Sequence, residues 1–271
     1  MTVKTRPPRS RIPSRPEPNR SDWAFWLDTS ALLLWGSLLL KYWVSGQIYY
    51  LLHPDYIWLA VSGGIGLLAL GISQLIRFFS RSNSKLRLES RLQLQMQHIT
   101  VLPSGFGSSL LIAIACLGLL YTPRPFASDI ALQRGVTDTL SMTRSQPQEF
   151  RVSNQPETRS LLDWIRTINV YPEPDAYAGD PVNVEGFVVY PPELPEDHLM
   201  ISRFIITCCA ADAYPVGLPV KVDGDRTQFA EDEWFKVSGT MMTATVNGQR
   251  QLVIDSDSLE SIPTPRNPYD T

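Results

Sequence analysis

The sequence predicts an α + β protein in two parts, a helical membrane region followed by a small β-domain. Three long apolar segments in the N-terminal half have the length of membrane helices, and short strand-like segments separated by Gly and Pro turns fill the C-terminal half. The charge divides in the same way: residues 1–121 hold 12 Lys and Arg against 5 Asp and Glu, whereas residues 122–271 hold 12 against 22. This asymmetry indicates two environments rather than one globule.

The three apolar segments cover residues 23–44, 56–79 and 105–121. About 20 helical residues cross a ~30 Å hydrocarbon core and about 17 is the lower limit, so the third segment is short. Aromatic residues gather at the segment ends, as is typical of the membrane–water interface; they include Trp23, Trp26, Tyr42, Trp43, Tyr49, Tyr50, Tyr56 and Trp58. The pattern favours a lipid bilayer over burial inside a large soluble protein.

The basic residues predict the orientation of these helices. Lys and Arg are frequent in residues 4–20 and 77–91 and absent from residues 45–55. Because basic loops stay cytoplasmic, the N-terminus and the 77–104 loop are expected inside, and everything after Tyr121 outside. A cleaved signal peptide is rejected, since a long basic tail precedes the first segment and no small-residue cleavage pattern follows it. The Pro-rich tail, residues 1–22, is predicted to be disordered.

Within the spans, Asp28 and Lys41 lie near the ends of the first segment, where long or charged side chains anchor at the interface. Pairing with a partner protein is the alternative. Two small-residue pairs in the second segment, Ala60/Gly64 and Ser62/Gly66, have the spacing that lets helices approach closely. Cys116 in the third segment is expected to be a small packing residue.

The extracytoplasmic part begins with a predicted linker, residues 122–157, that contains a short helical piece at 129–134. An amphipathic helix at 158–168 follows, with Thr158 or Ser160 as its cap. Five strands are then predicted, and Asn247-Gly248 indicates a type I′ hairpin between the last two; the strands cover residues 182–188, 200–209, 218–222, 233–246 and 251–255.

Five short strands with interior glycines predict a small barrel of the OB type over residues 158–262, followed by a tail at 263–271. A β-sandwich fragment is the alternative. Nucleic-acid binding is excluded, because this half carries an excess of 10 acidic residues and phosphates demand a basic surface.

Cys208 and Cys209 are the residues most suggestive of chemistry. Adjacent cysteines make a poor structural disulfide, but two soft thiolates suit zinc or copper. If residues 200–210 form a strand, Cys208 points inward and Cys209 lies toward Arg203, whose charge favours a thiolate. If the strand ends earlier at the turn-like residues that follow, both sulfurs converge on one edge.

Further candidate metal ligands surround the pair in sequence. Asp212 lies four residues after Cys208, and His198, Met241 and Met242 are weaker candidates. A thiol redox site is a second interpretation, and plain packing of small or flexible apolar side chains is a third. The sequence contains no Ser–His–Asp triad and no phosphate-binding loop, so we expect that the protein is not an enzyme.

Several segments resemble a known family: Gly186-Phe187-Val188, Ile201-Ser202-Arg203-Phe204, Cys208 to Ala213 (CCAADA), Pro215-Val216-Gly217, and Trp234 with Val237 and Gly239. They resemble the YcgQ-type family, a bacterial group of uncharacterised membrane proteins, over about residues 182–254. The resemblance implies an inner-membrane location and a membrane-embedded partner, a permease of the YraQ/ArsP type, of which the family is described as a subunit. The predicted function is therefore an accessory subunit of a permease, whose β-domain binds or gates the transported solute. A stand-alone membrane-anchored metal-binding or thiol-redox protein is the alternative.

Overall fold

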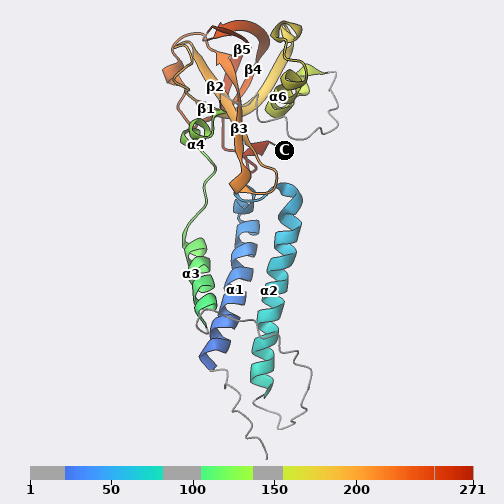
Figure 1. Cartoon of the computed structure of the whole chain (residues 1–271), viewed down its shortest axis with the longest axis vertical. Coiled ribbons are helices and arrows are strands. Elements are labelled where there is room, and N and C mark those ends of the chain that lie inside the picture. The colour runs from blue at the N-terminus through green and yellow to red at the C-terminus, as the bar shows by residue number, and fades with distance from the viewer. Residues whose placement is uncertain (1–21, 82–104, 137–154, 247, 271) are drawn as a thin grey trace, which may run out of the picture.

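The computed structural model describes residues 22–81, 105–136, 155–246 and 248–270. Apolar helices stand beneath a C-terminal β-domain in Figure 1. The predicted disordered tail, most of the 77–104 loop and residues 137–154 of the predicted linker lie outside the described residues. The chain is thus a mixed α + β protein, as the sequence predicts.

Three of the helices correspond to the predicted apolar spans: α1 (Asp22–Val44), α2 (Pro54–Arg81) and α3 (Phe106–Leu120). In length and composition α1 and α2 are able to cross a membrane. With 15 residues, α3 is only about 22 Å long at ~1.5 Å per residue. A 3-10 turn, η1 (Gln47–Tyr50), lies in the loop between α1 and α2.

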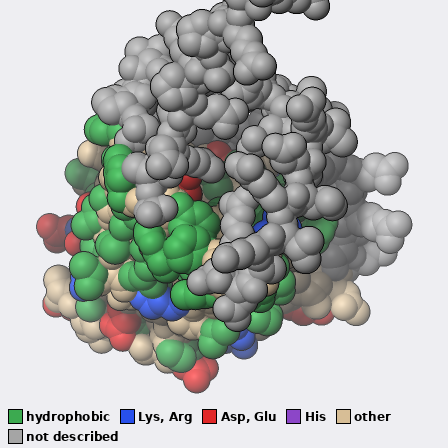
Figure 2. Space-filling view, turned by 90° about the horizontal axis from the view of Figure 1, so that it is seen from below, with side chains coloured by type: hydrophobic (Ala, Val, Ile, Leu, Met, Phe, Trp, Pro, Cys, Tyr) green, Lys and Arg blue, Asp and Glu red, His purple; other side chains and the backbone are tan. Residues whose placement is uncertain are grey.

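Helix α1 lies between α2 and α3 and contacts both (Figure 1). Gly36 allows the close approach to α2, because a Cβ there would lie 2.9 Å from the carbonyl oxygen of Gly64. Toward α3, the Tyr42 hydroxyl donates to the carbonyl of Gly118 at 2.6 Å. Seen along the long axis in Figure 2, hydrophobic side chains gather near the middle of the face.

Polar contacts within the helices refine the sequence predictions. Asp28 accepts a hydrogen bond from Ser108 of α3 at 2.5 Å, and Lys41 donates to the carbonyl of Leu119 at 2.7 Å. These two side chains therefore join helices of the same chain. Gly64 packs on α1 as the spacing indicates, whereas no described atom lies within 4 Å of a Cβ added at Gly66. Cys116, expected to be packed, is exposed on α3.

The short helices of the second part agree with the sequence analysis. Helix α4 (Ser128–Gln133) lies where a helical piece is predicted. Helix α6 (Leu161–Val170) begins at Ser160, whose side chain and that of Asp163 form a capping box, which satisfies amides at the helix start. Asp270 from the C-terminal end also accepts from the amide of Leu162 at 3.0 Å. The end of the chain therefore helps to cap this helix.

In the part of the chain that the structure describes, six strands form one sheet, and the last was not predicted. The strands are β1 (Pro181–Val189), β2 (His198–Ile205), β3 (Tyr214–Lys221), β4 (Trp234–Val246), β5 (Gln249–Ile262) and β6 (Tyr269–Asp270). Four further 3-10 turns lie in the described connections: η4 (Pro156–Thr158), η5 (Pro174–Tyr177), η6 (Ala210–Asp212) and η7 (Arg226–Gln228). β5 extends seven residues beyond the predicted segment, and the predicted tail contains β6.

The pairings of the first five strands form a circuit. β1 pairs with β2 and β4, β2 with β3, β3 with β5 in parallel, and β5 with β4. Val246 lies opposite Gln249, so β4 and β5 are joined by a two-residue turn in which Gly248 has φ 76°. The predicted hairpin is therefore present, and Asn247 itself lies outside the described residues.

Two apolar clusters fill the β-domain. One packs α6 against the sheet and includes Trp164, Ile201 and Val237, all with no exposed surface. The other contains Phe187, Phe204 and Trp234, whose rings pack in a row. Together they bury β2 and the next residue, Ile206, immediately before the loop that leads to β3.

Candidate functional site

Cys208 and Cys209 lie in the loop between β2 and β3, because the strand ends earlier than the pattern of residues 200–209 predicts. The carboxylate of Asp212 accepts hydrogen bonds from the backbone amides of Thr207 at 3.4 Å, Cys208 at 2.9 Å and Cys209 at 3.3 Å. Amides bound to a local side chain are not available to a neighbouring strand. The Asp212 side chain therefore turns the backbone out of the sheet after Ile206.

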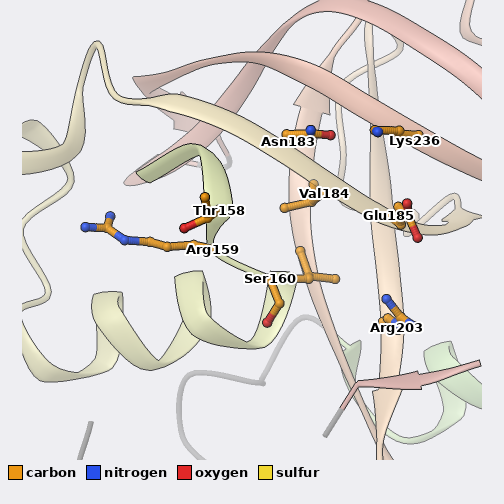
Figure 3. Close-up of a pocket in the computed structure, with 9 residues that line it drawn as sticks. Thr158, Arg159, Ser160, Asn183, Val184, Glu185, Arg203 and Lys236 are labelled. Carbon is orange, nitrogen blue, oxygen red and sulfur yellow. The ribbon is translucent and has the colours of Figure 1, made fainter. Parts of the chain in front are cut away.

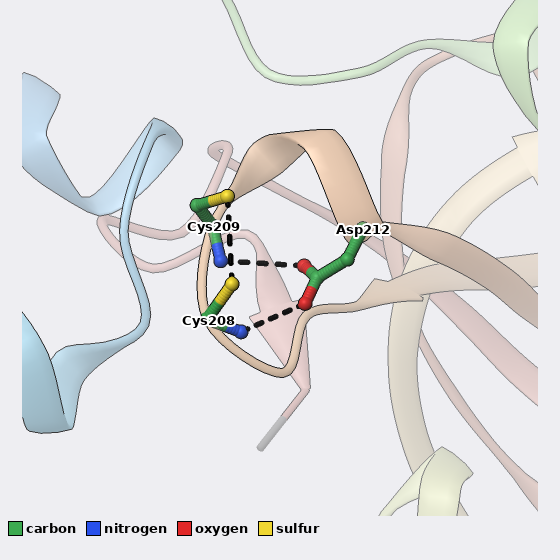
Figure 4. A group of neighbouring side chains, drawn as sticks. All are labelled: Cys208, Cys209 and Asp212. Carbon is green, nitrogen blue, oxygen red and sulfur yellow. Dashed lines mark hydrogen bonds between the residues drawn. The ribbon is translucent and has the colours of Figure 1, made fainter.

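This turn brings the two thiols together (Figure 4). Their Sγ atoms are 3.6 Å apart. Cys208 is exposed and Cys209 is half-buried, so the prediction that Cys208 points inward is wrong. The alternative, that the strand ends early and both sulfurs converge, describes the arrangement.

Arg203 does not have the expected role beside Cys209. Its guanidinium donates to the carbonyls of Pro268 and Asn267 at 3.4 and 3.2 Å and lies over the ring of Trp234. The side chain therefore holds the C-terminal segment against β2.

The local electrostatics keep a proton on Cys208 and a charge on Asp212. The pKa of Cys208 is raised to about 11. The largest cause is its hydrogen bond with Cys209, and the second is its hydrogen bond with the Asp212 carboxylate. Burial pushes the pKa of Asp212 upward, but the hydrogen bonds from the amide and side chain of Cys208 outweigh it, so this pKa is lowered overall. A cation that binds the two sulfurs must therefore displace the Cys208 proton.

Three of the predicted ligands form one cluster. Ligand atoms of Cys208, Cys209 and Asp212 all lie within 4.8 Å of one another. The weaker candidates lie apart from it: His198 begins β2, at the far end from the cysteines, and its Nδ1 is 2.7 Å from Asp197. Met241 is buried in the core beneath α6, and Met242 packs against the second cluster. The structure thus supports the packing interpretation for both methionines.

The cysteine loop, residues 206–213 between β2 and β3, also contacts the loop between α1 and α2. The sequence analysis did not predict this contact. The amide of His53 donates to the carbonyl of Cys208 at 3.1 Å, and the amide of Ala210 donates to the carbonyl of Leu51 at 2.9 Å. Leu52 and Cys209 form an isolated antiparallel bridge. The backbone of the two cysteines therefore joins the β-domain to the helices; Figure 4 shows the α1–α2 loop beside the pair.

The C-terminal segment strengthens the same junction. The Tyr269 hydroxyl donates to the carbonyl of Tyr50 at 2.9 Å, and Arg266 lies over the ring of Tyr49. The short strand β6 places Tyr269 there through its parallel pairing with β2. No periodic pattern marks a two-residue strand, so the sequence carried no signal for this contact.

Burial raises the pKa of Tyr269 to about 12. An unfolded tyrosine has a pKa of about 10, so the neutral phenol stabilises the folded state below pH ~10, and this contribution is lost as pH rises through 12. We expect the unfolding free energy in detergent to fall between these pH values less steeply in Tyr269→Phe than in the wild type. Tyr171→Phe, at an exposed position, is the control; equal slopes in all three proteins would contradict the prediction.

A second polar feature is a hollow of about 210 Å³ between the start of α6 and β1 (Figure 3). The charged side chains that line the hollow are already engaged elsewhere. Lys236 lies opposite the oppositely charged Glu185 in the β1–β4 register, and Arg203 donates hydrogen bonds to backbone carbonyls of the C-terminal segment. Arg159 points away from the hollow in Figure 3 and pairs with Asp180 at 3.6 Å. These charges stabilise the fold around the hollow and do not converge on its centre.

Comparison with known proteins adds a family to this description. A search of curated proteins and a search of solved structures found no match. Residues 144–270 match the family model described as DUF1980 C-terminal domain. The match covers α6, all six strands and the cysteine loop, and it agrees with the predicted membership of an uncharacterised family; the YcgQ-type relationship and the permease partner stay predictions. The C-terminal part of this chain is therefore similar to the DUF1980 C-terminal domain.

Proposed function

We propose that this protein is a multi-pass subunit of the bacterial inner membrane that accompanies a permease and presents a soft-metal site on an extracytoplasmic β-domain. The observation that carries the proposal is the Cys208–Cys209–Asp212 cluster, which lies in the loop bound to the α1–α2 loop. A solute held there is next to the ends of the membrane helices. This position suits an accessory subunit that receives or releases a transported ion.

The directions of the helices support three crossings with the β-domain outside. Gly105, at the start of α3, lies against Trp23 at the start of α1, and Gly118 near the end of α3 bonds to Tyr42 near the end of α1. The two helices therefore run in parallel. The β-domain contacts the α1–α2 loop, and residues 45–55 contain no Lys or Arg, which favours the extracytoplasmic side.

The strand circuit supports an OB-type barrel for the extracytoplasmic domain. Five strands paired in the order β1–β2–β3–β5–β4–β1, with a parallel β3–β5 contact, return to their starting strand. Closure removes exposed strand edges, which suits a small domain outside the membrane. The short helix α6 covers one apolar cluster of this barrel.

The partner and the metal are tested together by purification from native membranes in mild detergent. We expect a permease to accompany the full-length chain, and zinc or copper to be present in the wild type and lost in Cys208→Ser and Cys209→Ser. Cys116→Ser, which removes the remaining cysteine, is the matched control and should retain the metal. Equal metal content in all four proteins contradicts the metal site, and a chain that purifies without a permease contradicts the subunit role.

The orientation is tested in intact cells with a maleimide that does not cross membranes. Cys208 is exposed, so it should be labelled from outside, and the label should disappear in Cys208→Ser/Cys209→Ser. Labelling only after the cells are opened would place the domain in the cytoplasm and contradict the proposed topology.

If the chain binds metal but has no partner, the second candidate applies, a stand-alone membrane-anchored metal-binding or thiol-redox protein. The 3.6 Å contact of the two sulfurs is the observation that favours it. Reversible disulfide formation by added oxidised glutathione, in the absence of metal, would identify the redox form.

A further inference from the structure

The number and type of ligands at the cysteine loop narrow the metal class. Two sulfurs and one carboxylate converge, and no other His, Cys, Asp or Glu of the described residues belongs to this cluster. Met241 is only 1% exposed in the core, so its thioether is not at the surface where the cysteines lie. A soft site for Cu⁺ uses thiolate and thioether donors, whereas a carboxylate oxygen is a ligand of Zn²⁺.

The distance between the sulfurs indicates the coordination geometry. Two bonds of about 2.3 Å at a tetrahedral angle place the sulfurs ~3.8 Å apart, and a linear arrangement with the same bonds places them ~4.6 Å apart. The Sγ atoms of Cys208 and Cys209 are 3.6 Å apart. The pair therefore matches a tetrahedral cation with little movement, whereas a linear one requires the thiols to separate by about 1 Å.

Asp212 is positioned to supply a third ligand without losing its structural role. A carboxylate has about four lone-pair sites, and the three amides of Thr207, Cys208 and Cys209 occupy three of them. The side chains of Thr207 and Cys208 also hydrogen-bond to this carboxylate, so a cation bound here takes the place of one of these side-chain hydrogen bonds. The Oδ2 atom of Asp212 accepts a hydrogen bond from the backbone amide of Cys208 and from no other backbone amide in the described loop. This oxygen can bind a cation while the other hydrogen bonds hold the carboxylate in orientation, as outer-shell contacts do in metal sites.

We propose that Cys208, Cys209 and Asp212 form an exchangeable site for a tetrahedral divalent cation of the zinc class, with the fourth position open. The inference rests on the proposed function and specifies the cation class and its exchange. Structural zinc sites are closed by four protein ligands, whereas three ligands leave a position for water or an incoming donor. Because Cys208 is exposed, a donor from solvent or from a partner reaches the bound ion directly.

Cobalt(II) is the probe for this geometry, because tetrahedral Co²⁺ bound to thiolates absorbs visible light strongly and six-coordinate Co²⁺ absorbs weakly. The reduced, metal-free full-length chain in detergent is titrated with Co²⁺, then with Zn²⁺. We expect one Co²⁺ per chain, a tetrahedral spectrum with a sulfur-to-cobalt charge-transfer band, and bleaching by one equivalent of Zn²⁺. A weak six-coordinate spectrum overturns the inference.

Variants separate the ligands. Asp212→Asn should keep the charge-transfer band and lose at least the roughly 10–100-fold in affinity that removing an outer-shell partner costs. Cys208→Ser and Cys209→Ser should lose the band, and Cys116→Ser should match the wild type. Unchanged Zn²⁺ affinity in Asp212→Asn overturns the third ligand. Asparagine keeps one acceptor oxygen, which can still bind the Thr207 and Cys209 amides that share one carboxylate oxygen in the wild type. Hydrogen exchange of these two amides in Asp212→Asn separates a lost ligand, which leaves their protection intact, from a lost turn, which abolishes it.

The outcome also distinguishes this inference from the proposed function. Binding of Cu⁺ that needs both cysteines, without binding of Zn²⁺ or Co²⁺, overturns the zinc-class site and leaves the soft-metal subunit standing. Failure to bind any of the three ions overturns both.

Discussion

Gly239→Ala is expected to lower the unfolding free energy of the β-domain by about 3 kcal/mol, at the upper end of the cost of overpacking. A Cβ at Gly239 would lie 2.1 Å from the carbonyl oxygen of Asp255 and 3.0 Å from its carbonyl carbon, both in the backbone of β5. The register between β4 and β5 shifts between Ser238 and Gly239, so the two backbones approach closely at an irregularity. A methyl group there forces the strands apart, because no flexible side chain can move aside.

The measurement is urea or thermal unfolding of the full-length protein in detergent, followed by hydrogen exchange of the β4 and β5 amides. Thr240→Ala, one residue along the same strand with an exposed side chain, is the control and should change stability by less than about 1 kcal/mol. If Gly239→Ala and Thr240→Ala unfold alike, β4 and β5 do not approach as closely as described.

Ala210→Pro is expected to loosen the junction between the β-domain and the membrane helices while leaving the domain folded. Ala210 is the first residue of the 3-10 turn η6 (Ala210–Asp212), and Cys209 before it is extended, with φ −156° and ψ 171°. Proline suits the first position of a helical turn, and the residue before it prefers extended backbone. The substitution therefore removes one donor, the amide that binds the carbonyl of Leu51, and places the proline ring against that oxygen.

Hydrogen exchange of residues 47–56 reports the result. We expect the amide of His53, which donates to Cys208, to exchange at least about tenfold faster in Ala210→Pro, since loss of ~1.4 kcal/mol of local stability is a factor of ten. Ala210→Ser keeps the amide and should exchange as the wild type does. Unchanged protection in Ala210→Pro would mean that the contacts of Tyr269 and Arg266 hold the junction by themselves.

The helices and most strands were predictable because their patterns are local. Apolar length predicts α1 and α2, and the cap at Ser160 with apolar residues at helical spacing predicts α6. The Asn247-Gly248 pair predicts the β4–β5 turn for the same reason. Short or non-local elements were missed: β6 has two residues, and the polar second half of β5 shows no alternation although it pairs with β4.

The candidate site was predicted by residue type and not by arrangement. Cys208, Cys209 and Asp212 are chemically conspicuous in any conformation, so the sequence alone could nominate them. Whether Cys208 faces the core depended on where β2 ends, and the alternation of residues 200–209 gave the wrong end. The Asp212 carboxylate decides it by taking the three amides that strand pairing would need.

By itself, the sequence determined that apolar helices precede an acidic β-domain, and that one vicinal cysteine pair is available for soft-metal chemistry. Only the tertiary structure decided that the sulfurs converge with Asp212, that His198 and Met241 lie elsewhere, and that the cysteine backbone is bound to the α1–α2 loop. The physical reason is that helix formation and strand alternation depend on neighbouring residues. The junction joins residues 49–53 to 208–210 and 266–269, which lie far apart in the sequence and are brought together by the tertiary fold.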